Sequence, residues 1–117
     1  QVMAVNLNSV YYVTKALLPT LIERNGGRII NIASIASKVG ARYTAAYTAS
    51  KHGVLGLTRS LALEMIPYWI TVNAICPGFF KTKMAAVLIE TLGEDKMAAH
   101  APLKRIGDDE DFGDLVD

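Results

Sequence analysis

Residues 28–34 read Arg28-Ile29-Ile30-Asn31-Ile32-Ala33-Ser34, a short apolar and β-branched run that ends in a hydroxyl side chain. A run of this kind is typical of a strand in a parallel sheet, where both faces are covered. Open α/β sheets bind their ligands at the carboxyl ends of the strands, so Ser34 falls where a substrate oxygen can be held. The stretch therefore predicts an α/β fold with a candidate site at the edge of the sheet.

The segments around this strand alternate between helical and extended patterns. Gly26-Gly27 and Pro67 are expected to end the first two helices. We expect helices over residues 1–25, 43–65 and 84–100, strands over 28–33 and 70–75, a loop over 34–42, and a further helix starting in the acidic stretch 107–111. This alternation is what one part of a parallel α/β domain requires.

Tyr47 and Lys51 stand four positions apart in Ala46-Tyr47-Thr48-Ala49-Ser50-Lys51. Residues i and i+4 project from one face of a helix, so the lysine ammonium is expected beside the phenol. A neighbouring cation favours the phenolate, which suits a general acid that works near neutral pH. One such pair also arises by chance on a solvated helical face. Together with Ser34 upstream, the pair predicts a proton-transfer site.

The chain resembles the short-chain dehydrogenases/reductases over nearly its whole length. The resemblance rests on Tyr47 and Lys51, on Ser34 at the family's spacing, on Asn6 in Val5-Asn6-Leu7-Asn8-Ser9, and on the strand and loop of residues 70–82. Within the family the sequence looks most like the 3-oxoacyl-[acyl-carrier-protein] reductases, the polyketide ketoreductases, and the sugar or hydroxyacid dehydrogenases. The implied fold is a Rossmann-like, doubly wound parallel sheet.

The resemblance implies an oxidoreductase with four catalytic residues. A nicotinamide cofactor, NAD or NADP, would exchange hydride with a carbonyl or alcohol carbon while Tyr47 exchanges a proton with the oxygen. Lys51 would favour the phenolate and bind the nicotinamide ribose, and Ser34 would orient the substrate oxygen. Asn6 would hold the water that refills the proton relay. An asparagine inside a helix is locally unfavourable, so its presence at this position independently suggests a specific role.

The resemblance also implies a cofactor-binding set that joins Tyr47 and Lys51 to Pro77, Gly78 and Thr82. The last three match the family loop after the second strand, where backbone groups approach the nicotinamide and the threonine contacts its carboxamide or the phosphates. Glycine permits such a close approach. Without the resemblance, Pro77-Gly78 is also an ordinary turn that changes the direction of the chain.

The length of 117 residues supplies about half of a doubly wound dinucleotide fold. No Gly-x-x-x-Gly-x-Gly phosphate loop occurs in it. We therefore expect residues 1–117 to be the catalytic, C-terminal half of one domain, inactive by itself and without measurable affinity for NAD(P). Ser37 and Lys38 stand where many relatives have alanine-glycine or glycine-leucine, and Trp69 where relatives often have glycine. These departures leave the catalytic set intact.

Composition narrows the classes of partner. The formal net charge of +1 offers no basic stripe for nucleic acid, and no apolar run reaches the length of a membrane span. The single cysteine, Cys76, excludes an internal disulfide and suits a reducing, cytoplasmic compartment. His52 and His100 have no second ligand at metal spacing, so no metal site is expected.

Two further expectations concern assembly and the competing function. In the family the two long helices form the dimer interface, and both helical segments here are rich in small and apolar residues, so we expect a homodimer or homotetramer. The substrate would be a small-molecule or carrier-bound carbonyl or alcohol. The competing interpretation is a catalytically idle relative that uses the fold for binding or assembly.

Overall fold

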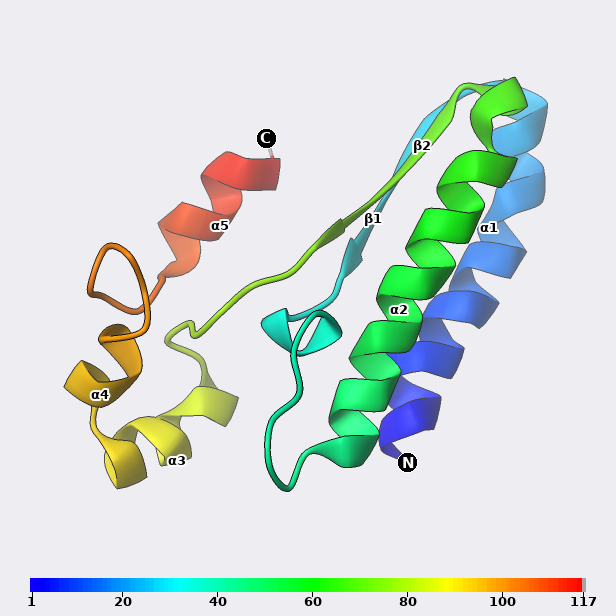
Figure 1. Cartoon of the computed structure of the whole chain (residues 1–117). Helices are drawn as coiled ribbons and strands as arrows, with labels where there is room; N and C mark the ends of the chain where they lie inside the picture. Colours follow the sequence, from blue (N-terminus) through cyan, green and yellow to red (C-terminus); the bar gives the residue numbers. More distant parts are fainter. Residues whose placement is uncertain (117) are drawn as a thin grey trace. The chain divides into compact units, whose positions relative to one another are not determined.

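The computed structural model describes residues 1–116 of the chain. The chain divides into two compact units, Gln1–Pro77 and Gly78–Asp117. The first unit contains the parallel sheet and the two long helices, and the second contains three shorter helices (Figure 1). The α/β arrangement predicted from the sequence is therefore present in the first unit.

The amino-terminal helical segment begins with a π-helical turn, Ala4–Asn8, and continues as α1, Ser9–Arg24. It ends at Asn25, which adopts the left-handed conformation with φ 53° and donates its N–H to the carbonyl of Ile22. The prediction that Gly26-Gly27 would end this helix was wrong by one position. Asparagine tolerates the left-handed region, so it supplies the cap, and Gly27 instead begins the first strand.

Strands β1, Gly27–Ile32, and β2, Ile70–Ile75, pair in parallel with Gly27 opposite Ile70 and Ile32 opposite Ile75. Both predicted strands are confirmed to within one residue at each end. The hydrogen bonding continues past the strands, since Ala33 N donates to Ile75 O at 2.7 Å. The carboxyl ends of the two strands therefore lie side by side (Figure 1).

Helix α2, Ala45–Glu64, returns along the sheet beside α1 (Figure 1). It starts two residues later than predicted because Tyr43 has a left-handed φ of 65°, which no right-handed helix accommodates. It ends before Pro67, as predicted, and Pro67 lies in a short 3-10 turn, Ile66–Tyr68. The core joins both helices to both strands and consists of Leu61, Met65, Ile70 and Val72 with partly buried Leu18, Leu21, Ile22, Ile29, Leu57 and Ala62 around them.

The second unit contains α3, Lys83–Leu92, α4, Glu94–Ala98, and α5, Asp109–Val116. The single helix predicted over residues 84–100 is wrong, because Gly93 interrupts it with φ 85°, a conformation that only glycine adopts readily. The helix predicted from the acidic stretch is confirmed as α5. Met97, Ala98 and Ile106 form the small core of this unit. None of the helices within residues 1–116 combines the length and apolarity that crossing a bilayer requires.

Candidate active site

Ser34 lies directly beyond the carboxyl end of β1 and is 8% exposed. It caps a 3-10 turn, Ile35–Ser37, where its Oγ accepts a 3.1 Å hydrogen bond from Ala36 N. The loop predicted over residues 34–42 therefore contains a structured turn that fixes the direction of the Ser34 side chain. Within residues 1–77 no acceptor takes the hydroxyl proton, so Ser34 can donate it to a substrate oxygen.

Tyr47 and Lys51 lie on one face of the first turns of α2, as their spacing predicted. The Lys51 Nζ stands 5.9 Å from the centre of the Tyr47 ring. The same ammonium donates a 3.2 Å hydrogen bond to the carbonyl oxygen of Ile32, the last residue of β1. An ammonium has three N–H donors, so two remain for other partners. The lysine therefore joins the tyrosine to the sheet edge at which Ser34 lies.

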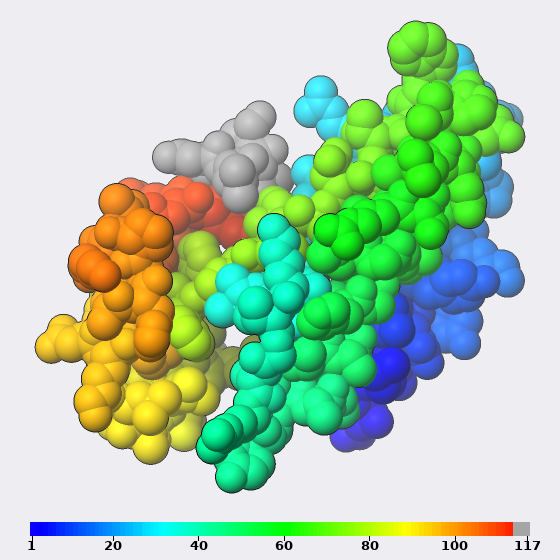
Figure 2. Space-filling model, viewed as in Figure 1, coloured from blue at the N-terminus to red at the C-terminus, as the bar shows by residue number. Residues whose placement is uncertain are grey.

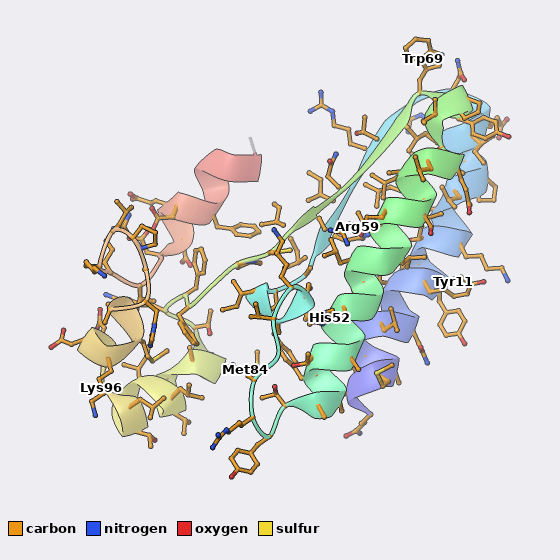
Figure 3. All side chains as sticks on the ribbon, viewed as in Figure 1. Tyr11, His52, Arg59, Trp69, Met84 and Lys96 are labelled. Carbon is orange, nitrogen blue, oxygen red and sulfur yellow. The ribbon has the colours of Figure 1, made fainter. Side chains whose placement is uncertain are left out.

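A second tyrosine and lysine with the same spacing lie on α1, where Lys15 Nζ stands 6.0 Å from the centre of the Tyr11 ring. Sequence reasoning did not single out this pair. Its residues line a groove of about 270 Å³ between α1 and α2, and Figure 3 shows Tyr11 pointing away from the strands. The two pairs have nearly equal separations, so separation alone identifies no site. The bond from Lys51 to the end of β1 is what distinguishes the α2 pair.

Asn6 lies in the π-helical turn, and its Nδ2 donates a 3.2 Å hydrogen bond to Ser50 Oγ. Ser50 is completely buried on α2 and donates in turn to the carbonyl of Tyr47 at 2.7 Å. Gly53 lies against Leu7 beside this contact, and a Cβ there would lie 2.7 Å from Leu7 Cδ2 and require that side chain to shift. Asn6 is thus tied to the helix that carries Tyr47 and Lys51, which gives its unfavourable helical position a physical reason.

Sequence reasoning did not identify Ser50, although it stands between Tyr47 and Lys51. Its signal was weak, because a serine inside a helix is unremarkable until its neighbours in space are known. Once Asn6 is placed opposite, Ser50 is the acceptor that keeps the Asn6 amide paired in a half-buried position. Buried polar groups are hydrogen-bonded in most native structures, and the bond between Asn6 and Ser50 provides such a partner for both side chains.

The candidate cofactor residues after β2 divide between the two units. Pro77 belongs to the first unit, and its carbonyl oxygen accepts a 3.0 Å hydrogen bond from Ile35 N, the residue after Ser34. Gly78 and Thr82 belong to the second unit and are exposed. The Thr82 hydroxyl caps α3 by accepting a 3.1 Å hydrogen bond from Ala85 N. Asn6, Ser34, Tyr47, Lys51 and Pro77 are therefore the candidate residues that the first unit contains.

Other polar groups have local structural partners. The Nδ1 atom of His52 lies at hydrogen-bond distance, 3.0 Å, from the carbonyl oxygen of Thr48 on the exposed side of α2. In the second unit the Arg105 guanidinium donates two 2.6 Å hydrogen bonds to Asp111, which hold the pKa of the Asp111 carboxyl well below its usual range. Among the side chains that the structure describes, those of residues 1–113, no group of three His, Cys, Asp or Glu is arranged to bind a metal ion.

A family model described as short chain dehydrogenase matches residues 1–93. The 3-oxoacyl-[acyl-carrier-protein] reductase FabG of Buchnera aphidicola is 38% identical over 98% of this chain and 47% of its own length. The (3R)-3-hydroxyacyl-CoA dehydrogenase of Rattus norvegicus is 42% identical over 99% of this chain and 45% of its own length. The chain thus spans about half the length of the curated relatives it matches.

Solved structures show the same relationship. A variant of actinorhodin polyketide ketoreductase crystallised with NADPH is similar with a TM-score of 0.87 and 40% identity, over 95% of this chain and 47% of that one. A gluconate 5-dehydrogenase from Burkholderia cenocepacia, in complex with NADP and tartrate, has a TM-score of 0.86 and 33% identity, over 91% of this chain and 42% of that one. The fold is therefore the Rossmann-like α/β fold that the sequence predicted.

Proposed function

Because this chain belongs to the short-chain dehydrogenase family, we propose that the protein containing it is an NAD(P)-dependent oxidoreductase of carbonyl and alcohol groups. The observation that carries the proposal is the contact of Lys51 with both the Tyr47 ring and Ile32 at the end of β1, two residues before Ser34. It gathers a proton donor, a cation and a free hydroxyl donor on one unit of the chain. The region 1–117 is proposed to be the catalytic part of one larger domain.

Each residue has a separate task in this proposal. Tyr47 gives its phenolic proton to the substrate oxygen during reduction and takes it back during oxidation. Ser34 donates its hydroxyl proton to the same oxygen, which holds the reacting carbon in place. Asn6 holds a water molecule, and this water passes a proton back to Tyr47 after the phenol has given up its own. Lys51 stabilises the phenolate by its charge.

The residues present suit the nicotinamide end of the cofactor and not its phosphates. Lys51 has two unused N–H donors that fit the hydroxyl groups of the nicotinamide ribose, and Pro77, Gly78 and Thr82 are the proposed contacts of the nicotinamide end. The nicotinamide, when bound, supplies or accepts the hydride. The phosphates need a glycine-rich turn that residues 1–117 do not contain. The proposed cofactor is NAD or NADP.

The proposed substrate is a 3-oxoacyl thioester, either carrier-bound or bound to coenzyme A. The support is the identity with a 3-oxoacyl-[acyl-carrier-protein] reductase and with a 3-hydroxyacyl-CoA dehydrogenase over nearly the whole chain. A second candidate is a sugar-acid or polyketide ketone, which the likeness to a gluconate 5-dehydrogenase and a polyketide ketoreductase favours. Both candidates use the same four catalytic residues.

A cytoplasmic location is proposed for the protein, and a homodimer or homotetramer formed through α1 and α2. Both helices have apolar side chains exposed on their surfaces, including Tyr12 at 63%, Leu17 at 55% and Leu63 at 72%. In the space-filling view α1 and α2 form one continuous surface (Figure 2). Exposed apolar side chains on adjoining helices are what a second subunit would cover.

The experiment is a turnover assay on the complete protein with NADH and NADPH. Three substrates are compared: a 3-oxoacyl thioester, a keto-gluconate and a cyclic polyketide-like ketone. Oxidation of nicotinamide that depends on the thioester supports the preferred substrate, and preference for either ketone supports the second candidate. Absence of turnover with every substrate, from protein that binds cofactor, would favour a catalytically idle relative.

A further inference from the structure

We propose that Ser37 is a positioning residue of the reaction, because its hydroxyl joins the Ser34 backbone to the Lys51 backbone. Its Oγ accepts a 3.3 Å hydrogen bond from Ser34 N and donates a 2.7 Å hydrogen bond to Lys51 O. One side chain thus contacts two of the residues to which catalytic tasks are assigned. The inference rests on the proposed function, since a positioning role needs a reaction.

Burial makes this bridge rigid. Ser37 is 2% exposed, so water does not compete for its two hydrogen bonds. A side chain with a hydroxyl can accept and donate at once, whereas alanine or glycine can do neither. The Ser37 hydroxyl therefore sets the distance between the turn after β1 and the first turns of α2 from within the protein.

The bridge acts on the reacting groups through the backbone. Ser34 Oγ is held by Ala36 N, and Ser34 N is held by Ser37, so both ends of Ser34 are fixed within one short turn. The Lys51 backbone is fixed by Ser37, and its side chain is fixed by Ile32 O. A shift of the turn against α2 would move the substrate oxygen relative to the phenol. Misplacements of this kind lower the rate more than the affinity.

Thr58 on α2, the helix that carries Lys51, provides a control. Thr58 is 4% exposed, and its hydroxyl also makes two hydrogen bonds, one from Asn31 Nδ2 at 3.0 Å and one to Val54 O at 2.7 Å. Thr58 lies about two helical turns beyond Lys51, and its hydroxyl is hydrogen-bonded to Asn31 and Val54, neither of which is a proposed catalytic residue. Thr58→Val removes the hydroxyl and keeps the volume, so it measures the general effect of losing a buried, doubly bonded hydroxyl.

The experiment compares Ser37→Ala, Ser37→Thr, Ser37→Cys and Thr58→Val in the complete protein by steady-state kinetics and thermal denaturation. Ser37→Ala removes both hydrogen bonds of the bridge and should lower kcat about tenfold while leaving the substrate KM within about twofold. Ser37→Thr should restore most of kcat, and Ser37→Cys, with its weaker donor, should fall between the two. Thr58→Val should lower the melting temperature comparably and change kcat by less than about twofold.

The outcomes separate the inference from the function on which it rests. An active wild-type protein with unchanged kcat in Ser37→Ala would overturn the positioning role alone. Equal kcat losses in Ser37→Ala and Thr58→Val would also overturn it, because general destabilisation would then explain both. If Ser37→Ala does not fold, equal kcat values for Ser37→Cys and wild type would have the same consequence. A wild-type protein without turnover would overturn the proposed function, and the positioning role with it.

Discussion

The ammonium of Lys51 donates a 3.2 Å hydrogen bond to the carbonyl oxygen of Ile32, the last residue of β1. This bond attaches the first turns of α2 to the carboxyl end of the sheet. It also holds the cation 5.9 Å from the centre of the Tyr47 ring. A helical pair of tyrosine and lysine is thereby placed at the strand end where α/β folds bind their ligands.

Replacing Lys51 with methionine should weaken cofactor binding and lower turnover together, because the ammonium lies at the sheet end and beside the phenol and is proposed to bind the ribose. The dissociation constant for the nicotinamide cofactor should rise about tenfold, and kcat should fall because the ammonium no longer holds its place beside Tyr47. Fluorescence titration and steady-state kinetics measure the two effects. Lys15→Met removes the matching lysine on α1 and should change neither; unchanged values in Lys51→Met as well would exclude the shared role.

Replacing Ser50 with alanine should destabilise the protein by about 1–2 kcal/mol. The substitution leaves the half-buried Asn6 amide without its acceptor and removes the hydroxyl of Ser50, which is completely buried. Urea denaturation of the complete protein measures the change. Ser60→Ala, an exposed position on the same helix, should stay within about 0.5 kcal/mol of wild type. A loss at Ser50 no larger than that at Ser60 would show that the Asn6 contact contributes little.

Replacing Trp69 with glycine should stabilise the protein by about 1 kcal/mol. Trp69 adopts a left-handed conformation with φ 57°, which costs a residue with a Cβ about 1–2 kcal/mol and costs glycine little. The indole is 77% exposed and projects from the turn before β2, so little packing is lost (Figure 3). Chemical denaturation tests this. Tyr68→Gly, at the neighbouring position in the 3-10 turn, should destabilise; stabilisation by both or neither would contradict the strain argument.

The Asp111 carboxyl should titrate well below the ordinary range. The two hydrogen bonds from Arg105 lower its pKa, and the backbone N–H of Asp108 adds to the effect. Because the folded pKa lies below the unfolded value of about 3.9, the contribution to stability is present above that pH and is lost as the pH falls further. A carbon NMR titration of the carboxyl measures the midpoint. Arg105→Gln should return it toward about 4; an unchanged midpoint would contradict the assignment.

Local patterns predicted most of the first unit. The two strands follow from β-branched runs, and the long helices follow from apolar spacing and from Pro67, so neither depends on distant contacts. The ends of the helices were less predictable where more than one residue could form the cap. Asn25 and Gly26 both tolerate a left-handed cap, and the asparagine was used. In the second unit Gly93 broke a helix whose pattern alone did not require a break.

The positions of the candidate residues on their elements were predictable from the sequence, and the hydrogen bonds that support them were not. The spacing of Tyr47 and Lys51 predicted that they share one face of α2, and the apolar run predicted that Ser34 follows the end of β1. The hydrogen bonds of Ser37 and Ser50 depend on how closely the turn, the π-helical segment and α2 approach one another. Such approaches are set by packing, for example by the absence of a side chain at Gly53, and leave no local pattern in the sequence.

The most direct test of the proposed chemistry compares Tyr47→Phe with Tyr11→Phe in the complete protein. Both substitutions remove a phenolic hydroxyl from a tyrosine that stands about 6 Å from a lysine four residues later, but only Lys51 is bonded to the end of β1. Tyr47→Phe should lower kcat by at least about a hundredfold, the contribution of general acid–base catalysis, and leave cofactor affinity within a few-fold. Tyr11→Phe should keep normal turnover. Near wild-type turnover in Tyr47→Phe would contradict the assignment of Tyr47 as the proton donor.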